Sequence, residues 1–395
     1  MRPCTMRIRL LAVIGALVLV AGCTSGADDK ATPKPLVSAT VPAGPIDPTK
    51  ATVLKPGEDL PTVASLPSEI GTERAVFRGF ASANVLFGDL SLPAKSRASN
   101  TGGVTTQSHP MLYNRNSRSI ERLDQGFTRP KKTQVLDMAS VEANTVWVES
   151  PEAKVANGDI ALYSYDRTSG FRRMLMGTPL PDSGVFYAND LAIVGSRVYF
   201  SMATIDNAVG QGAAIYSGDA SGRGQVKVLV EDGQRLSIDG TKMTYFVGKK
   251  KFVRDLDSGD TDPAPVSSHA SEATFCGAEF ATAYKTVCEG GSVGETGIDD
   301  AVLAVTDPSG RATKIGPFSG TAPQVAGLLG SWLAFSSTDG DGASHEYLFE
   351  LATHKLSVLP KGARFVHGLA PNLALLDVPD AAGTYHQSLV QLPAS

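Results

Sequence analysis

A short unit recurs about seven times along this chain and constrains the fold more than any other feature. Each unit holds an apolar strand, a polar loop, a second apolar strand and a turn built on Asp and Gly. The clearest copy contains Thr145–Val148, then Ile160–Tyr163, then the turn Asp166–Gly170. Asp accepts hydrogen bonds from nearby backbone amides and Gly adopts positive φ, so such a turn ends one strand and starts the next. The repeat indicates an array of small sheets.

The spacing of the units predicts a β-propeller. We expect first and second strands in pairs at 75–77 and 85–87, 135–138 and 146–148, 191–194 and 198–200, 235–238 and 243–246, 274–276 and 281–284, 325–328 and 332–335, and 365–367 and 373–376. The anchors Phe87 and Leu375 lie six units apart, which gives about 48 residues per unit. Propeller repeats have about this length. The predicted fold is all-β, with seven four-stranded blades; six or eight blades stay open, because the first and fifth units are poorly punctuated.

The polarity of the strands supports this fold over a two-sheet sandwich. Second and third strands, such as Thr145–Val148 and Ala214–Tyr216, are apolar on both faces, as expected where neighbouring blades cover both sides. Fourth strands, such as Gln225–Val230, alternate polar and apolar residues, as expected for a half-exposed outer strand. The last unit shows three strands. We therefore expect residues 51–54 or 62–64 to supply its fourth strand and close the ring.

The N-terminal segment predicts the cellular location. Three arginines precede the apolar run Leu10–Val20, which is too short to span a bilayer but typical of a signal peptide. The run ends in Val20-Ala21-Gly22-Cys23, which resembles a bacterial lipobox. The resemblance implies cleavage before Cys23 and a diacylglyceryl group on its sulfur, and hence a lipid anchor on the extracytoplasmic side of the cell membrane. The alternative is an ordinary secretory signal that happens to contain Cys.

Three segments follow from these patterns. Residues 1–22 are the predicted lipoprotein signal peptide, residues 23–66 a flexible linker rich in Pro, Ala and Thr, and residues 67–395 the propeller. The formal net charge of −4 argues against nucleic acid as a partner, because nucleic-acid binding needs a basic surface. The negative charge also argues against adhesion to anionic lipids by charge alone. We therefore expect the protein to be attached to the membrane through its lipid anchor.

The repeat region resembles the bacterial propellers of the WD40-like and TolB-like kind. The resemblance covers roughly residues 70–395 and is carried by Leu162-Tyr163 with Asp166 and Gly170, and by Gly330–Phe335. The Ser-Pro-Asp-Gly turn of many TolB-type repeats is absent from every unit. The resemblance implies the propeller fold and a tendency to bind partners.

The cysteines pose one structural question. Cys4 leaves with the leader and Cys23 is the predicted lipid site, so Cys276 and Cys288 remain in an oxidising compartment and are expected to form a disulfide. Geometry opposes this if Gly277–Glu279 is the hairpin turn, because Cys288 then lies several residues beyond the position that faces Cys276. Both arrangements stay open. The pair lacks the CxxC spacing of metal or redox sites.

The sequence predicts no catalytic residue, metal site or cofactor. The six histidines show no metal-binding spacing, and the Gly-rich segment Glu289–Glu295, which contains Gly290-Gly291-Ser292-Val293-Gly294, is interpreted as a flexible connection. Asp339–Gly342 departs from the calcium-loop pattern and is interpreted as a hairpin loop. His367 is the one histidine expected beside the central channel, because it lies on an inner strand.

Binding is the function that the sequence favours. Polar loops are predicted between second and third strands, which open on one face of a propeller: 95–109, 151–158, 203–212, 289–299, 338–345 and 379–386. They are either plain connections or a recognition surface for a protein, peptide or glycan. The alternatives are a propeller enzyme, such as a glycan hydrolase or lyase with paired carboxylates in the channel, and a purely structural spacer. An enzyme should show acids or bases with shifted pKa values in the channel.

Overall fold

The structure is a computed structural model of the chain. It describes residues 42, 44–91, 107–126, 133–150, 160–178, 184–206, 209–248, 250–264, 278–280, 284–289, 292–293, 298–369, 372–380 and 385–393. The chain divides into units 1–37 and 38–395, and every described residue belongs to the second. Within these residues no helix has the length and hydropathy needed to cross a membrane. The single short helix, η1 (Pro48–Lys50), is a 3-10 turn.

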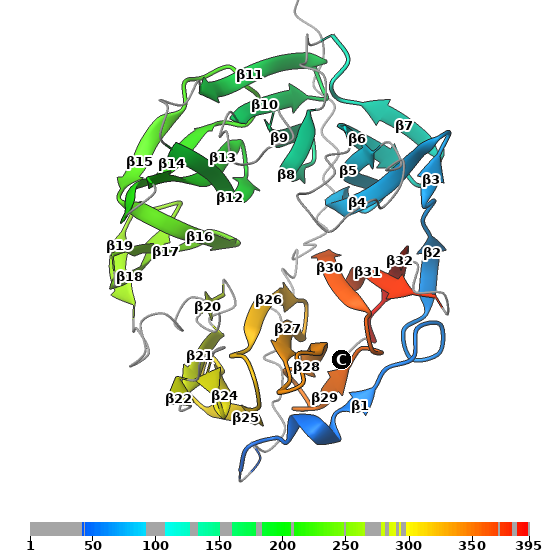
Figure 1. Cartoon of the computed structure of the whole chain (residues 1–395), viewed down its shortest axis with the longest axis vertical. Coiled ribbons are helices and arrows are strands. Elements are labelled where there is room, and N and C mark those ends of the chain that lie inside the picture. The colour runs from blue at the N-terminus through cyan, green and yellow to red at the C-terminus, as the bar shows by residue number, and fades with distance from the viewer. Residues whose placement is uncertain are drawn as a thin grey trace, which may run out of the picture. The chain divides into compact units, whose positions relative to one another are not determined.

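The second unit is a seven-bladed β-propeller, as the sequence predicts (Figure 1). We number the blades in chain order. Blade 1 holds β3 (Glu69–Ile70), β4 (Glu73–Ser82), β5 (Val85–Ser91), β6 (Ser108–Asn114) and β7 (Ser119–Arg122); blade 2 holds β8 (Gln134–Val141), β9 (Asn144–Ser150), β10 (Ile160–Asp166) and β11 (Phe171–Thr178). Blade 3 holds β12 (Gly184–Val194), β13 (Arg197–Asp206), β14 (Val209–Asp219) and β15 (Lys227–Glu231); blade 4 holds β16 (Gly233–Asp239), β17 (Lys242–Val247), β18 (Lys250–Asp255) and β19 (Thr261–Ala264).

The remaining blades complete the ring. Blade 5 holds β20 (Ala278–Glu279), β21 (Lys285–Glu289), β24 (Ala301–Thr306) and β25 (Ala312–Phe318), and the hairpin of β22 (Ser292–Val293) and β23 (Ile298–Asp299) is a separate small sheet. Blade 6 holds β26 (Gln324–Leu329), β27 (Trp332–Thr338), β28 (Ser344–Glu350), β29 (Leu356–Val358) and β1 (Thr52–Val53). Blade 7 holds β30 (Arg364–Leu369), β31 (Leu373–Pro379), β32 (Tyr385–Gln391) and β2 (Thr62–Ser65).

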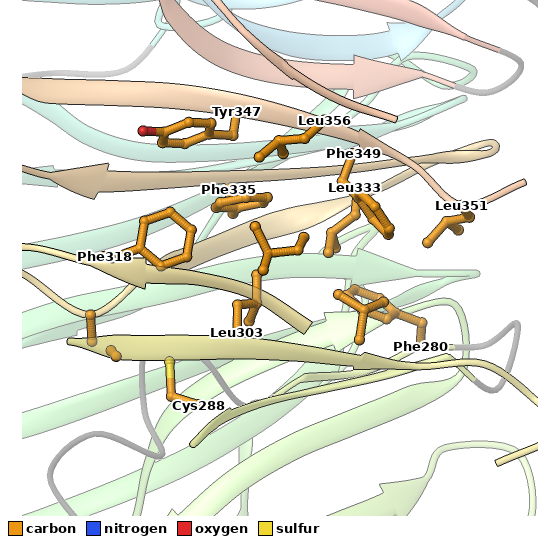
Figure 2. Packing of buried hydrophobic residues seen from close by; sticks show 14 residues of the cluster. Phe280, Cys288, Leu303, Phe318, Leu333, Phe335, Tyr347, Phe349, Leu351 and Leu356 are labelled. Atoms are coloured by element: carbon orange, nitrogen blue, oxygen red, sulfur yellow. The ribbon is translucent and has the colours of Figure 1, made fainter. Parts of the chain in front are cut away.

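Burial follows the predicted gradient from inner to outer strands. In β9 every residue after Asn144 is buried, whereas β7 and β15 have no buried residue. The buried apolar residues form six clusters, and each cluster joins two neighbouring blades. Between blades 5 and 6, for example, Phe318 and Leu303 pack against Phe335 and Leu333 (Figure 2). Each sheet thus depends on its neighbours to cover its apolar faces.

The N-terminal side of the chain closes the ring. β2 pairs antiparallel with β32, with Thr62 opposite Val390 and Ala64 opposite Leu389. It is the outermost strand of blade 7, which is the role expected for residues 62–64. The other candidate, residues 51–54, acts elsewhere: β1 adds to blade 6 in parallel with β29.

Residues 44–66, which we call the N-terminal arm, follow the outer strands of three blades. The Ile46 amide donates to the Lys314 carbonyl of blade 5 at 2.8 Å, and the Leu54 amide donates to the Val358 carbonyl of blade 6 at 2.9 Å. The Leu66 amide then donates to the Gln387 carbonyl of blade 7 at 3.1 Å. The arm is therefore hydrogen-bonded in turn to blades 5, 6 and 7.

Blade 5 departs from the sequence prediction. A second strand was expected at 281–284, but β21 begins at Lys285, and the expected first strand at 274–276 lies outside the described residues. Of the two arrangements left open for this hairpin, the turn at Gly277–Glu279 does not occur, because Ala278 and Glu279 form β20 and pair with Thr286 and Lys285.

Two of the predicted polar loops contain strands. Much of the expected loop 203–212 is formed by the ends of β13 and β14, which are longer than the corresponding strands of other blades. The expected loop 289–299 contains the hairpin β22–β23. These loops are therefore shorter than the polar composition suggests.

The turns between third and fourth strands are capped as predicted in several blades. Asp166, Asp219 and Asp307 each accept a hydrogen bond from the backbone amide two residues later, at 2.9, 2.8 and 2.8 Å. In blade 4 the capping residue is Asp255, which accepts from the amide of Asp257, so the expected turn at Asp257–Gly259 starts two residues earlier. The repeated cap fixes the same hairpin geometry around the ring.

The arm should contribute to the stability of the whole propeller. Leu60 has no exposed surface and packs with Leu54, Trp332 and Leu376 of blades 6 and 7. We expect Leu60→Ala to lower the free energy of unfolding by about 2–5 kcal/mol, measured by urea denaturation, because it leaves a cavity in this core. Val63→Ala is the matched control; Val63 is 45% exposed on β2, and its loss should cost no more than about 0.5 kcal/mol. Equal effects of the two substitutions would show that the arm does not pack as described.

Candidate functional site

A cavity of about 760 Å³ lies at the inner strands of blades 1, 2, 3 and 7. We call it the channel cavity, because β4, β8, β12 and β30 are the innermost strands of their blades (Figure 1). Its walls are about equally polar and apolar, and the apolar part is formed by side chains such as Phe77, Phe80, Met138, Ile193 and Val366. Its size is within the range of ligand pockets. The polar residues in the wall determine which ligands the cavity can bind.

Arg78 of β4 clamps blade 1 to blade 2. Its Nε donates to Asp89 Oδ1 at 2.6 Å within blade 1. Its two terminal nitrogens donate to the carbonyls of Leu136 and Val135 in β8, at 3.2 and 3.4 Å. Because each guanidinium nitrogen has a protein partner, Arg78 holds the wall together and is not a spare cation for a ligand.

Asp137 of β8 ties blade 2 to blade 3. Its Oδ2 accepts a hydrogen bond from the Leu191 amide at 3.2 Å, and its Oδ1 accepts from the Met138 amide at 2.8 Å. Burial raises the pKa of this carboxyl above its ordinary value, and the two amides and the charge of Arg78 offset the rise in part. Asp137 is thus a desolvated carboxylate in the channel wall, already bonded to the backbone.

Gln387 of β32 joins blade 7 to blade 1. Its amide group forms two hydrogen bonds with the backbone of Phe77, with Phe77 N donating to Oε1 at 2.5 Å and Nε2 donating to the Phe77 carbonyl at 2.8 Å. The side-chain amide therefore bonds to the Phe77 backbone as a neighbouring β-strand would, and it links blade 7 to blade 1 where the ring closes. Asp377 of β31 differs from the other polar groups, because its buried Oδ1 has no hydrogen-bond partner among the described residues.

The channel cavity therefore combines apolar walls with charges that are largely engaged between blades. Such a surface can bind an extended apolar or mixed segment. In the described part of the chain no group of three or more His, Cys, Asp and Glu side chains is placed to hold a metal ion.

The sequence singled out His367, which lies on β30 opposite Leu375. It thus sits on an inner strand, as expected; its side chain lies outside the description. Arg78, Asp137 and Gln387 were not singled out, because each acts on a partner in another blade. Gln387 and Phe77 are 310 residues apart in the sequence, and no local pattern marks such a contact.

The predicted lipid site Cys23 and the predicted disulfide partner Cys276 both lie outside the described residues. Cys288 lies on β21, is buried between blades 5 and 6, and is disulfide-bonded. The register of β20 with β21 removes the geometric objection, which assumed a turn at 277–279. The pairing of Cys276 with Cys288 stays a prediction.

Most of the expected recognition loops lie outside the described residues, including 95–106, 151–158 and 381–384. The turn of blade 6 is described and is a hairpin loop, as predicted for Asp339–Gly342. Asp339 Oδ1 accepts from the amides of Asp341 and Ala343, at 3.0 and 2.8 Å. Its Oδ2 forms a hydrogen bond with His345 Nε2 at 3.0 Å. Asp339 therefore organises the turn rather than a calcium ion.

A buried ionic network lies in blade 1. His109 Nδ1 is 2.5 Å from Asp124 Oδ2, and its Nε2 is 3.7 Å from Glu73 Oε1. Arg122 lies 3.5 Å from Glu73 and 3.6 Å from Asp124. The network joins β4, β6, β7 and the residues just after β7. We interpret it as structural, because each member has a charged neighbour.

Glu346 on β28 is a further carboxyl in an apolar setting, at the contact of blade 6 with blade 7. Burial raises its pKa to about 7, although the Arg364 charge and a backbone hydrogen bond from Phe365 oppose the rise. The folded protein therefore binds this proton more tightly than the unfolded chain does.

Comparison with known proteins identifies the fold and no family. No family model and no curated protein matches the chain. Among solved structures it is similar to the β-propeller domain of the Trilobed protease from Pyrococcus furiosus, at 7% identity and a TM-score of 0.52, over 82% of this chain and 96% of that one. It is also similar to an acylaminoacyl peptidase (9%, TM-score 0.49, 82% and 52% covered) and to TolB from Acinetobacter baumannii (14%, TM-score 0.33, 72% and 60% covered). At these identities the likeness shows the propeller fold alone.

The shifted pKa of Glu346 makes a prediction about stability and pH. As the pH rises from 4.5 to about 7, the unfolded chain loses this proton before the folded protein does, so the free energy of unfolding should fall. Glu346→Gln should remove this part of the pH dependence, measured by urea denaturation across the range. Glu231→Gln, at the exposed end of β15, should retain the wild-type dependence. Parallel curves for wild type and Glu346→Gln would contradict the assignment.

Proposed function

We propose that this protein is a lipid-anchored, extracytoplasmic binding module that holds a peptide or glycan segment of a partner in the channel cavity. The observation that carries the proposal is the state of the charges in the cavity wall. Arg78 and Asp137 are engaged by the neighbouring blade, so the apolar side chains of the wall remain for contact with a ligand. A wall of this kind recognises the shape of a ligand and has little need to move during binding.

The anchor is proposed from the sequence. The run Leu10–Val20 followed by Val20-Ala21-Gly22-Cys23 supports cleavage before Cys23 and lipidation of its sulfur. Acyl chains stabilise membrane attachment by about 0.8 kcal/mol per buried CH₂ group, so several chains on one residue would hold the protein firmly. The propeller would then present its binding surface outside the cytoplasm.

A propeller hydrolase or lyase is the second candidate, and one observation favours it. Asp137, whose pKa is raised, and Asp377 line the same cavity, as a carboxylate pair in a glycan-cleaving enzyme would. Binding is preferred because both oxygens of Asp137 already accept backbone amides. Loss of a glycan-cleaving activity in Asp377→Asn, with binding retained, would favour the enzyme.

A single experiment tests anchor and binding separately. Crosslinking of the intact protein in its own cell envelope should capture a partner from the membrane fraction. Ala192 lines the channel cavity, and we expect Ala192→Arg to stay in the membrane fraction but to lose at least nine-tenths of the captured partner, because the long side chain fills the cavity. Cys23→Ser should leave the membrane fraction.

The control for the cavity variant is Ala312→Arg, at the exposed start of β25 in blade 5. It should keep both the membrane attachment and the partner. An Ala192→Arg protein that folds and still captures the partner would reject the channel as the binding site. A Cys23→Ser protein that stays in the membrane fraction would reject the lipid anchor.

A further inference from the structure

A second concavity, the blade-6 pocket, is separate from the channel cavity. It has a volume of about 400 Å³ and lies between the N-terminal arm and the blades 5 and 6. Its apolar lining includes Pro48 and Val53 of the arm, Phe318 of β25 and Tyr347 of β28. The Tyr347 ring is stacked on Phe335 at 5.1 Å and lies edge-on to Phe318 at 5.7 Å, so its position is fixed by the core.

The polar lining of this pocket contains the donors Lys361, His345 and Tyr347, together with hydroxyls that can donate or accept: Thr49, Ser319 and Ser337. Lys361 and His345 line it together with Tyr347, whose hydroxyl lies at the end of the ring away from the leucines of the core (Figure 2). No ion pair of Lys361 and no hydrogen bond of the Tyr347 hydroxyl is present among the described residues. Asp339, the one carboxylate in the lining, is saturated by two amides and by His345. These bonds hold the pKa of Asp339 below its ordinary value, with His345 as the main cause.

The wall around these donors is rigid. Thr321 and Thr338 exchange two hydrogen bonds of 3.0 Å, one between backbone atoms and one through the Thr321 hydroxyl. Gly320 allows this approach, since a Cβ there would lie 2.4 Å from the Thr338 carbonyl oxygen. Because the side chains of such a pocket are already fixed, little conformational entropy is lost when a ligand binds.

We propose that the blade-6 pocket binds a small apolar carboxylate, about one amino-acid residue in size. The carboxylate would accept hydrogen bonds from Lys361 and the Tyr347 hydroxyl, and the apolar body would lie between Phe318 and the arm. Among the described residues of the lining, the Asp339 carboxylate already accepts three hydrogen bonds, so it has little capacity left for the hydroxyls of a neutral sugar. A cationic ligand would be repelled by the positive charge of Lys361. The carboxylate can come from the C-terminus of a peptide or from a free carboxylic acid.

The arm couples this pocket to the attachment of the N-terminal segment. A ligand that contacts Pro48 and Val53 binds only when the arm is docked, so it stabilises docking by mass action. The amides of Ile46 and Leu54, which bond to blades 5 and 6, should therefore exchange more slowly when ligand is bound. A ligand in the channel cavity would leave these two amides unchanged.

The test is calorimetric titration of the purified full chain with N-acetyl-L-phenylalanine and with its uncharged amide. The carboxylate should bind at least about tenfold more tightly than the amide. Lys361→Gln should weaken binding of the carboxylate about tenfold and leave binding of the amide unchanged. Tyr347→Phe should weaken the carboxylate by a smaller factor while the core stacking persists. The result depends neither on Cys23 nor on the channel.

Lys355→Gln is the matched control, because it removes one exposed positive charge from the turn before β29, in the same blade but outside the pocket. It should bind both compounds as the wild type does. A tripeptide ending in Phe that binds more tightly than 3-phenylpropanoate would assign the peptide source, and the reverse would assign a free acid. Equal affinity for carboxylate and amide, no effect of Lys361→Gln, or unchanged exchange at Ile46 and Leu54 would each overturn the proposal.

Discussion

The packing of each sheet between two others is the constraint on which this structure depends. A blade of this propeller has apolar side chains on both faces, and six buried clusters among the described residues cover them at every contact between neighbouring blades except that of blades 4 and 5. A row of such sheets would leave two apolar faces in water, so the row closes into a ring. The closure uses residues from both sides of the sequence: β2 pairs with β32, and Gln387 of blade 7 bonds to Phe77 of blade 1.

Local patterns were sufficient to predict the repeat but insufficient where two registers fit equally well. Val146–Val148 and Trp332–Phe335 are continuous apolar runs beside clear turns, and both are second strands as predicted. In blade 5 two weakly apolar runs are adjacent, 281–284 and 285–289, and the sequence pattern predicted the second strand of the blade at 281–284. In the structure this strand is β21 at 285–289, which places Thr286 and Cys288 on the buried side of the sheet. Composition cannot decide between such registers, because the decision rests on contacts with other blades.

The functional surfaces were harder to predict than the fold for the same reason. The channel wall is held by Arg78, Asp137 and Gln387, whose partners lie in other blades. The blade-6 pocket joins the arm to residues some 300 positions later in the chain, and the sequence drew attention only to its loop 338–345, which contains Asp339 and His345. The two cavities differ in the groups that line them. The channel cavity has apolar side chains beside polar groups that are bonded between blades. The blade-6 pocket has the hydrogen-bond donors Lys361 and Tyr347 beside the N-terminal arm.

Hydrogen exchange at the closure tests the central claim, that the ring is one cooperative unit sealed by β2. The amide of Leu66 donates to the Gln387 carbonyl at the edge of β2, and Leu389 lies within β32 of the same blade. If the closure is part of the cooperative fold, the two amides should exchange at similar, slow rates set by global unfolding. Rapid exchange of Leu66 while Leu389 stays protected would show that the ring holds together without its N-terminal strand.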